Sequence, residues 1–269
     1  MKVVVIIPCH IQNTEQFLCL CDCIISLIKQ SYSCSIYLSI SFSSEELLHF
    51  FNESIFPLFK SRVVFFIQSK QTFQMIHIYK VFENIKDFDL IMFCDDDDQY
   101  TLNRVEHFVK FKTENSNIHI IQENIPKHSE ISEYWCYGIS YDVLNDFFDK
   151  SKNYMDLLEN KFADIYFRNY LIYNQRFSDI VKFTTKTPSY IYSPKPNSIT
   201  LTIQKKRLVY ERSGKIDLQE VYNQMTFAII ENNYIKLKLL IDKIKISEEE
   251  FLKIIPFDKI KSFTNCLYN

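Results

Sequence analysis

The N-terminal part of the chain alternates short apolar runs with segments whose apolar residues recur every three or four positions. Residues 3–7 form a continuous β-branched run, typical of a strand covered on both faces and hence of a parallel sheet. Residues 15–30 then carry apolar side chains at helical spacing, with Thr14 as a candidate N-cap. A strand followed by a helix is the opening of a βαβ unit.

The same alternation continues to about residue 95. We expect further strands at residues 35–40, 62–68 and 90–94, and helices at residues 44–59 (capped by Ser43 or Ser44) and 73–85. Three such units feeding a fourth strand predict an α/β fold with a doubly wound, mostly parallel sheet flanked by helices. In such sheets ligands bind at the carboxyl ends of the strands.

The remaining pattern is less regular. It predicts a helix beginning at Leu102 or Asn103, a strand at residues 118–122, helices at 141–150 and 155–174, and a basic, proline-containing stretch at 182–212. From about Gly214 the composition changes to Ile, Leu, Lys and Glu at helical periods. We therefore expect one domain at residues 1–213 and a helical C-terminal appendage at 214–269, whose helices pack on the domain or on a partner.

Composition narrows the function classes. The chain has 269 residues, of which 47% are apolar, and a formal net charge of −2. This balance indicates a folded protein and gives no overall field that would attract nucleic acid. The chain has only two glycines, which excludes the glycine-rich phosphate loops of dinucleotide-binding and Walker-type sites.

The cysteines and the N-terminal run bear on cellular location. Of eight cysteines, six fall inside apolar periodic segments, where we expect reduced, buried thiols: Cys9, Cys19, Cys21, Cys23, Cys34 and Cys94. The first apolar run breaks at Pro8 with no cleavage site after it, so it predicts a buried strand and no signal peptide. No segment approaches the ~20 apolar residues of a membrane span. The sequence predicts a cytoplasmic protein without a membrane span.

Four aspartates, Asp95 to Asp98, directly follow the predicted strand at residues 90–94. Carboxylates this close raise one another's pKa unless a cation lies among them. A few hard oxygen ligands, with water and phosphates completing the shell, suit Mg²⁺ or Mn²⁺. The alternative is a solvated turn in which Asp97 or Asp98 caps the next helix. The location at a strand end favours the cation site.

The stretch "FCDDDDQYTLNRV", together with "VVVIIPCH" near the N-terminus, resembles GT-A-fold glycosyltransferases, whose Asp-X-Asp motif ends a strand and holds a metal and a nucleotide sugar. The form "FCDDDDxYxxxRV" is most similar to small soluble glycosyltransferases encoded by large DNA viruses, including a viral rhamnosyltransferase. The resemblance spans roughly residues 1–210 and matches Tyr100 and Arg104 to the family's tyrosine and arginine. For a viral protein it implies the host cytoplasm.

The resemblance also implies a metal and donor site. Asp97, counted back from Tyr100, is the first metal ligand, Asp95 or Asp96 contacts the ribose or the metal, and Asp98 instead caps the following helix. The implied donor-binding residues are Pro8, Cys9, His10, Ser41, Gln74, His77, Asp95, Asp96 and Lys195. Ser41 stands where many relatives carry an aspartate for uracil, which leaves the base open. A structural role is the alternative for each histidine, and a solvated basic face is the alternative for Lys195.

Inverting transfer needs a carboxylate to accept the proton of the acceptor hydroxyl. In the resembling enzymes this base is an acidic residue at the start of a helix, well after the motif. The first candidate is Asp164 in "NKFADIYFRNYL", because aromatic neighbours raise a carboxyl pKa, and the second is Glu133 in "SEYWCYG". Trp135 either stacks on a sugar or packs in the core, and Gly138 would let a substrate approach the backbone.

The sequence thus predicts a metal-dependent, inverting glycosyltransferase that uses Mn²⁺ or Mg²⁺. It would move a hexosyl or deoxyhexosyl group from a nucleotide-diphosphate sugar, most simply a UDP-sugar, to a hydroxyl of a glycan or protein-linked sugar. One alternative is a nucleotidyltransferase, although "PCHIQNTEQ" is neither glycine-rich nor basic. Another is a non-catalytic sugar- or partner-binding module with a degenerate site.

Overall fold

The computed structural model describes residues 1–125, 133–160, 163–192, 224–226, 228–230, 234–244 and 255–268. The chain forms two compact units, Met1–Ser193 and Pro194–Asn269. The boundary predicted at residues 213 and 214 lies outside the described residues. The described part of the second unit is helical and includes α11 (Tyr234–Ile244) and α13 (Phe257–Tyr268).

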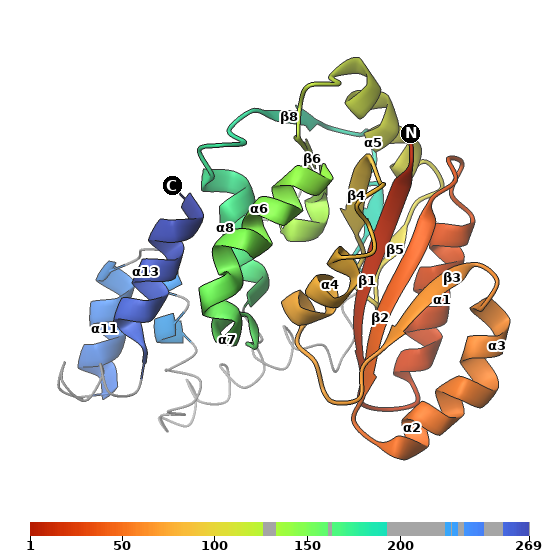
Figure 1. Ribbon diagram of the computed structural model, residues 1–269, viewed down its shortest axis with the longest axis horizontal. Coiled ribbons are helices and arrows are strands. Elements are labelled where there is room, and N and C mark those ends of the chain that lie inside the picture. The colour runs from red at the N-terminus through yellow and green to blue at the C-terminus, as the bar shows by residue number, and fades with distance from the viewer. Residues whose placement is uncertain are drawn as a thin grey trace. The chain divides into compact units, whose positions relative to one another are not determined.

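The first unit contains a seven-stranded sheet with the order β3-β2-β1-β4-β7-β6-β8 (Figure 1). Its strands are β1 (Val3–Ile11), β2 (Ser35–Phe42), β3 (Val63–Ile67), β4 (Leu90–Phe93), β6 (Ile120–Glu123), β7 (Tyr137–Ile139) and β8 (Ile180–Phe183). Strands β1 to β4 are mutually parallel, β6 and β8 are parallel, and β7 runs antiparallel between β4 and β6. The predicted mostly parallel sheet is confirmed.

A second, two-stranded ladder joins β5 (Gln99–Tyr100) to β9 (Tyr190–Ile191). The pattern of apolar residues did not predict either strand. Because β5 directly follows the aspartates, this ladder attaches the aspartate turn to a segment about 90 residues further along the chain.

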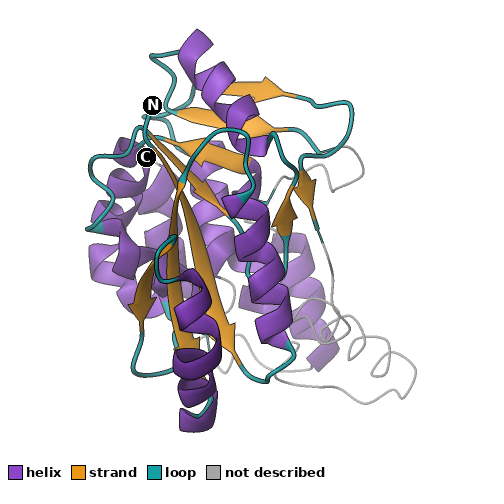
Figure 2. Cartoon of the chain, turned by 90° about the vertical axis from the view of Figure 1, so that its right-hand side faces the viewer, coloured by secondary structure: helices purple, strands orange, loops and turns teal. Residues whose placement is uncertain are grey.

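Helices flank both faces of the sheet (Figure 2). The central strands β1 and β4 are almost fully buried, as the apolar runs predicted. Helix α1 (Gln16–Ile28) is joined to the start of α5 (Arg104–Glu114) by Gln30, whose side chain bonds the Thr101 carbonyl and the Val105 amide. Helices α4 (Gln74–Phe82), α6 (Tyr141–Ser151) and α8 (Ala163–Tyr173) share an aromatic layer.

The predicted helix at residues 44–59 is broken into α2 (Glu45–Phe50), a π-helical turn (Phe51–Ile55) and α3 (Phe56–Phe59). Pro57 has no N–H for the usual bond four residues back, which explains why the regular helix does not continue. Ser44 accepts the Leu47 N–H at 3.4 Å, as predicted. Thr14 is not the cap of α1, because Asn13 accepts the Gln16 N–H instead.

The prediction of a single helix at residues 155–174 was also wrong. The segment forms α7 (Met155–Leu158) and then α8, which begins at Ala163. The new start places Asp164 in the first turn of a helix, where the helix dipole favours a carboxylate.

All eight cysteines are free thiols. Cys9, Cys23 and Cys94 are buried, as expected. The three others predicted to be buried, Cys19, Cys21 and Cys34, are partly exposed. For Cys21 the reason is helical geometry, since a residue two positions from the buried Cys23 points to the opposite side of α1.

Candidate functional site

The aspartate run forms the turn between β4 and β5. Asp95, Asp96 and Asp97 are partly exposed, whereas Asp98 is fully buried. Helix α5 begins six residues after Asp98 with Asn103 at its N-cap, so neither Asp97 nor Asp98 caps it. That capping role was a wrong prediction. Asp98 instead accepts a hydrogen bond of 2.8 Å from the Tyr190 hydroxyl.

Three side chains hold Asp95. Its Oδ1 accepts hydrogen bonds from the Tyr134 hydroxyl and, at 2.9 Å, from Gln74 Nε2. Its backbone N–H donates to the Tyr190 hydroxyl at 3.1 Å. Burial, followed by the charge of Asp98, raises the pKa of the Asp95 carboxyl well above its usual range. The hydrogen bonds therefore fix the orientation of Asp95, but they do not offset the effects of burial and of the Asp98 charge on its carboxyl group.

Asp96 lies beside the carboxyl end of β1. Burial and the charge of Asp97 raise its pKa to about 7, against the opposing effect of a hydrogen bond with the Cys9 thiol. Together with Asp95 and Asp97 it forms a group of hard oxygen donors under mutual repulsion, which is the chemistry that suits Mg²⁺ or Mn²⁺.

The described residues include no group of three His, Cys, Asp or Glu side chains arranged to hold a metal ion. A Mg²⁺ site completed by substrate phosphates needs only one or two protein carboxylates. The donor set of the aspartate run therefore fits such a cation.

A polar cluster lies at the carboxyl ends of β1 and β2. The Ser41 hydroxyl is 2.8 Å from His10 Nδ1 and 3.1 Å from His77 Nε2, and the Ser39 hydroxyl is 2.8 Å from His77 Nδ1. In the sheet, Pro8 pairs with Ser39 and His10 with Ser41. The structure thus brings His10, Ser41 and His77 into one connected group.

Helix α4 links this cluster to the aspartates. Gln74 and His77 lie one turn apart on it, so that one side chain contacts Asp95 and the other contacts the two serines. His77 is 1% exposed, and burial and the nearby His10 lower its pKa to about 3. His77 is therefore neutral at any physiological pH.

The two candidate bases, Asp164 and Glu133, lie close enough to interact. Burial and the charge of Glu133 raise the pKa of Asp164 to about 7, while Arg168 acts in the opposite direction. Asp164 also acts electrostatically on Tyr134, the residue that donates to Asp95. Tyr134 thus interacts with both Asp164 and the aspartate run.

The sequence missed a buried ion pair behind the aspartates. Arg104 and Glu123 are both fully buried and hydrogen-bonded to each other. Arg104 also donates to the Trp135 carbonyl at 2.8 Å, and Glu123 accepts the Ser189 N–H at 3.0 Å and its hydroxyl at 2.7 Å. A glutamate at the end of the apolar strand β6 was the available signal, since buried charges require partners.

Two of the predicted substrate contacts are packing residues. Trp135 is buried and stacked on Tyr190, with ring centroids 4.0 Å apart. Gly138 lies inside β7, and a Cβ there would come within 2.6 Å of the Phe108 ring. The prediction that Gly138 admits a substrate to the backbone was therefore wrong, because the Phe108 ring occupies that space.

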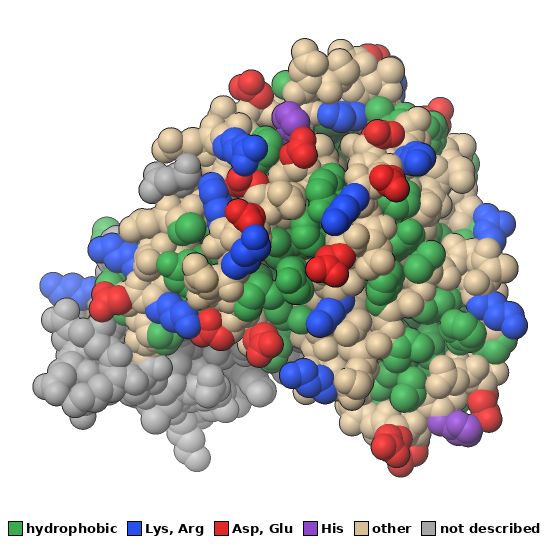
Figure 3. Space-filling model, in the orientation of Figure 1, with side chains coloured by type: hydrophobic (Ala, Val, Ile, Leu, Met, Phe, Trp, Pro, Cys, Tyr) green, Lys and Arg blue, Asp and Glu red, His purple; other side chains and the backbone are tan. Residues whose placement is uncertain are grey.

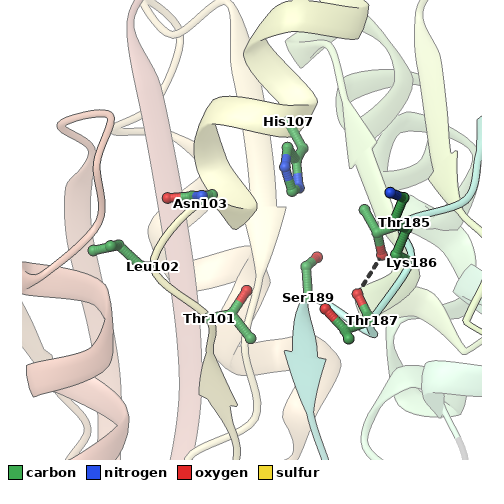
Figure 4. A pocket seen from close by; sticks show the side chains of 8 residues that line it. All are labelled: Thr101, Leu102, Asn103, His107, Thr185, Lys186, Thr187 and Ser189. Atoms are coloured by element: carbon green, nitrogen blue, oxygen red, sulfur yellow. Dashed lines mark hydrogen bonds between the residues drawn. The ribbon is translucent and has the colours of Figure 1, made fainter.

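A separate pocket of about 440 Å³ lies between the start of α5 and the segment after β8 (Figure 4). Its lining is largely polar: Thr101, Leu102, Asn103, His107, Thr185, Lys186, Thr187 and Ser189. Thr185 donates within this group to the Thr187 carbonyl at 2.6 Å. None of the predicted site residues that the structure describes lines this pocket.

On the face that Figure 3 shows, positive and negative side chains of the first unit are interspersed. No helix among the described residues is long and apolar enough to cross a membrane. Lys195, predicted to contact phosphate, lies outside the described residues.

No family model matches the chain, and no curated protein matches it. Solved structures of S. aureus TarS share its fold. TarS 1-349 in complex with UDP has a TM-score of 0.56 and 14% identity over 93% of this chain and 77% of that one. The complex with UDP-GlcNAc has a TM-score of 0.54 and 12% identity, covering 99% and 82%. A further TarS structure matches with a TM-score of 0.54 and 12% identity. The match covers 84% of this chain but only 42% of the TarS chain.

These likenesses, with the seven-stranded sheet, confirm the predicted GT-A-like α/β fold. At 12–14% identity they concern the fold alone.

Proposed function

We propose that this protein is a glycosyltransferase that uses a nucleotide-diphosphate sugar. The observation that carries the proposal is the meeting of the polar cluster and the aspartate run at one edge of the sheet. Strands β1, β2 and β4 supply His10, Ser41 and the aspartates, and α4 joins the two groups through Gln74 and His77. In parallel α/β sheets this carboxyl edge is where ligands bind.

In this proposal Asp97 and Asp95 hold Mn²⁺ or Mg²⁺, and Asp96 contacts the donor ribose. A bound cation would neutralise charge that develops on the departing diphosphate. Gln74 and Tyr134 fix the orientation of Asp95, and the Cys9 thiol supports Asp96. The donor chemistry and mutual repulsion of these carboxylates support a cation here.

Asp164 is the proposed base of an inverting transfer. The acceptor oxygen forms a bond to the anomeric carbon, the bond from that carbon to the diphosphate breaks, and the acceptor proton passes to Asp164. A pKa of about 7 suits a base that works near neutrality. Glu133 remains the second candidate, and its charge contributes to that pKa.

The proposed donor is a UDP-sugar. TarS, whose fold this chain shares, has been crystallised with UDP and with UDP-GlcNAc, which supports uridine and makes UDP-GlcNAc the first sugar to test. The acceptor in this proposal is a hydroxyl of a glycan or protein-linked sugar. An origin in a large DNA virus, with activity in the host cytoplasm, is the part of the proposal that rests on the sequence resemblance alone.

The test is a panel of nucleotide sugars with and without Mn²⁺, followed by thermal shift and by release of nucleotide. We expect stabilisation by a UDP-sugar that depends on the cation, since a ligand that binds only the folded state raises its stability. Asp97→Asn should abolish the metal-dependent shift, whereas Asp87→Asn, an exposed position before β4, should leave it unchanged. If no donor shifts the melting temperature, the assignment is wrong.

The released product separates the alternatives. A glycosyltransferase releases UDP, a nucleotidyltransferase releases pyrophosphate, and a binding module shows a thermal shift with neither product. Unchanged UDP release by Asp97→Asn would contradict the metal role.

A further inference from the structure

The polar cluster is part of a longer chain of hydrogen bonds that runs from Gln68, the residue after β3, to His10 on β1. Gln68 Nε2 donates to the Ser39 hydroxyl at 3.2 Å, and Ser39, His77, Ser41 and His10 follow in order at 2.8, 3.1 and 2.8 Å. Each hydroxyl and each neutral imidazole in such a chain has one proton to donate. The direction of donation therefore depends on the two ends.

The Gln68 end fixes the direction. Gln68 Nε2 also donates to the Phe66 carbonyl at 3.1 Å, so it is the amide nitrogen that faces Ser39. Ser39 is fully buried and accepts that bond, which leaves its own proton for His77 Nδ1. In the opposite order Ser39 would receive two donors, and its proton would have no acceptor among the described residues. An unmade bond of a buried hydroxyl disfavours that order by about tenfold or more.

The order then propagates to His10. His77 is neutral and accepts at Nδ1, so its proton sits on Nε2 and is donated to Ser41. Ser41 also accepts the Thr72 N–H at 3.3 Å, which fills its second lone pair and leaves its proton for His10 Nδ1. Burial lowers the pKa of His10, so the ring stays neutral and carries its proton on Nε2.

The one described side-chain hydrogen bond of His10 is made by Nδ1, and the ring also interacts with the Ser41 backbone. No described side-chain hydrogen bond involves Nε2, and this nitrogen is not among the buried atoms that lack a partner. The ring is half-buried at the carboxyl end of β1, beside Cys9, whose thiol contacts Asp96. Its N–H is therefore an open donor at the edge of the sheet where the donor nucleotide is proposed to bind.

We propose that the Gln68–Ser39–His77–Ser41 chain fixes His10 as a one-way hydrogen-bond donor that reads a keto oxygen of the nucleobase. This inference rests on the proposed function. A donor pairs with O4 of uracil but meets the amino group of cytosine at the same position, leaving two donors opposed. The site would thus select a uracil nucleotide over a cytosine nucleotide with neutral groups alone.

The tautomer is tested without any ligand. In a protein labelled with ¹⁵N-histidine, the ring nitrogen shifts at pH 7 should show His10 and His77 with the proton on Nε2. Ser39→Ala removes the donor to His77 Nδ1 and should give a mixture of tautomers at both rings. Ser35→Ala makes the same change at the other end of β2, at a hydroxyl with no described hydrogen bond, and should leave both tautomers unchanged. A proton on His10 Nδ1 in the unaltered protein would overturn the inference.

Base selection is tested by calorimetric titration with UDP and CDP in the presence of Mn²⁺. We expect UDP to bind about tenfold to a hundredfold more tightly, the cost of an unpaired polar group in a site. His10→Phe and Ser39→Ala should reduce this ratio to about threefold or less, and Ser35→Ala should retain it. Equal binding of the two nucleotides by the unaltered protein overturns the inference and leaves the proposed function intact. If neither UDP nor CDP binds although His10 carries its proton on Nε2, the proposed function is overturned, and the inference about base selection is overturned with it.

Discussion

The Tyr190 hydroxyl spans the aspartate turn, donating to Asp98 Oδ2 at 2.8 Å and accepting the Asp95 N–H at 3.1 Å. Its ring stacks on Trp135 with centroids 4.0 Å apart. Strand β9, which carries Tyr190, pairs with β5 directly after the turn. One side chain thus fixes both ends of the run that is proposed to hold the cation.

Tyr190→Phe keeps the ring packing and removes both bonds. We expect the aspartate turn to lose its fixed geometry, with kcat/KM reduced about tenfold, because a misplaced binding group loses a large part of its effect. The loss of a buried hydrogen bond should cost about 1–2 kcal/mol of unfolding free energy. Tyr37→Phe, on β2 and without a described hydroxyl bond, is the control for removal of a hydroxyl. Unchanged kcat/KM in Tyr190→Phe would show that the turn holds its geometry without this clamp.

Asp164 should set the acidic limb of the pH profile. A base must be ionised, so kcat/KM should fall as the pH drops through about 7, the pKa that burial and Glu133 give this carboxyl. Asp164→Asn should lose about a hundredfold or more in activity. Glu133→Gln should remain active with the limb shifted to lower pH, because it removes the neighbouring negative charge. If Glu133→Gln instead abolishes activity, Glu133 is the base.

The same shift has a consequence for stability. The folded-state pKa of Asp164 is raised from its usual 3.8, so the folded protein binds this proton more tightly than the unfolded chain. Stability contributed by that proton is lost as the pH rises from about 4 to about 7. Asp164→Asn should therefore be more stable than the unaltered protein above pH 7, with the difference vanishing near pH 4. Urea unfolding at several pH values measures it, and a constant difference across the range would contradict the shift.

Arg104 and Glu123 should be strongly coupled. Removing one partner leaves a buried charge, so Arg104→Met and Glu123→Gln should each cost about 3–5 kcal/mol in urea unfolding. The double variant Arg104→Met with Glu123→Met should cost much less than the sum of the two single changes, since no unpaired charge remains. Strictly additive costs would contradict this. Lys152→Ala, in an exposed ion pair, should have no measurable effect.

Gly138→Ala tests the packing role of the glycine. The added methyl group would lie 2.6 Å from the Phe108 ring and 3.1 Å from a Leu90 methyl group. We expect a loss of about 1–3 kcal/mol, and a partial recovery when Phe108→Leu makes room. A Gly138→Ala variant with unchanged unfolding free energy but no activity would contradict the packing role.

The sequence predicted the elements whose signal is local. The β-branched runs of β1 and β4 and the helical spacing of α1 and α4 follow from burial on one or both faces, and each is present. Local patterning also placed Gln74 and His77 on one face of α4, because three-residue spacing requires it. The expected meeting of the carboxyl strand ends follows from parallel topology.

What the sequence missed depends on pairing across long stretches of chain. Strands β5, β7 and β9 have two or three residues each, too few for any periodicity to register. Glu123 accepts hydrogen bonds from Ser189, 66 residues later, and no local pattern connects the two. The wrong role given to Asp98 has the same origin, since its partner Tyr190 lies 92 residues away.

The β5–β9 ladder has a consequence for the order of folding. Strands β1, β2 and β3 pair through successive βα units, so their contacts close short loops and can form early. The β1–β4 pairing and the β5–β9 ladder each close a loop of about 90 residues, and the second loop contains β6, β7 and β8. The four aspartates therefore follow strands that pair among themselves, whereas Tyr190 reaches them only through the second of these loops. Completion of the site should be one of the last steps of folding, so a chain truncated before β9 would keep its first four strands and lose the geometry of its acidic turn.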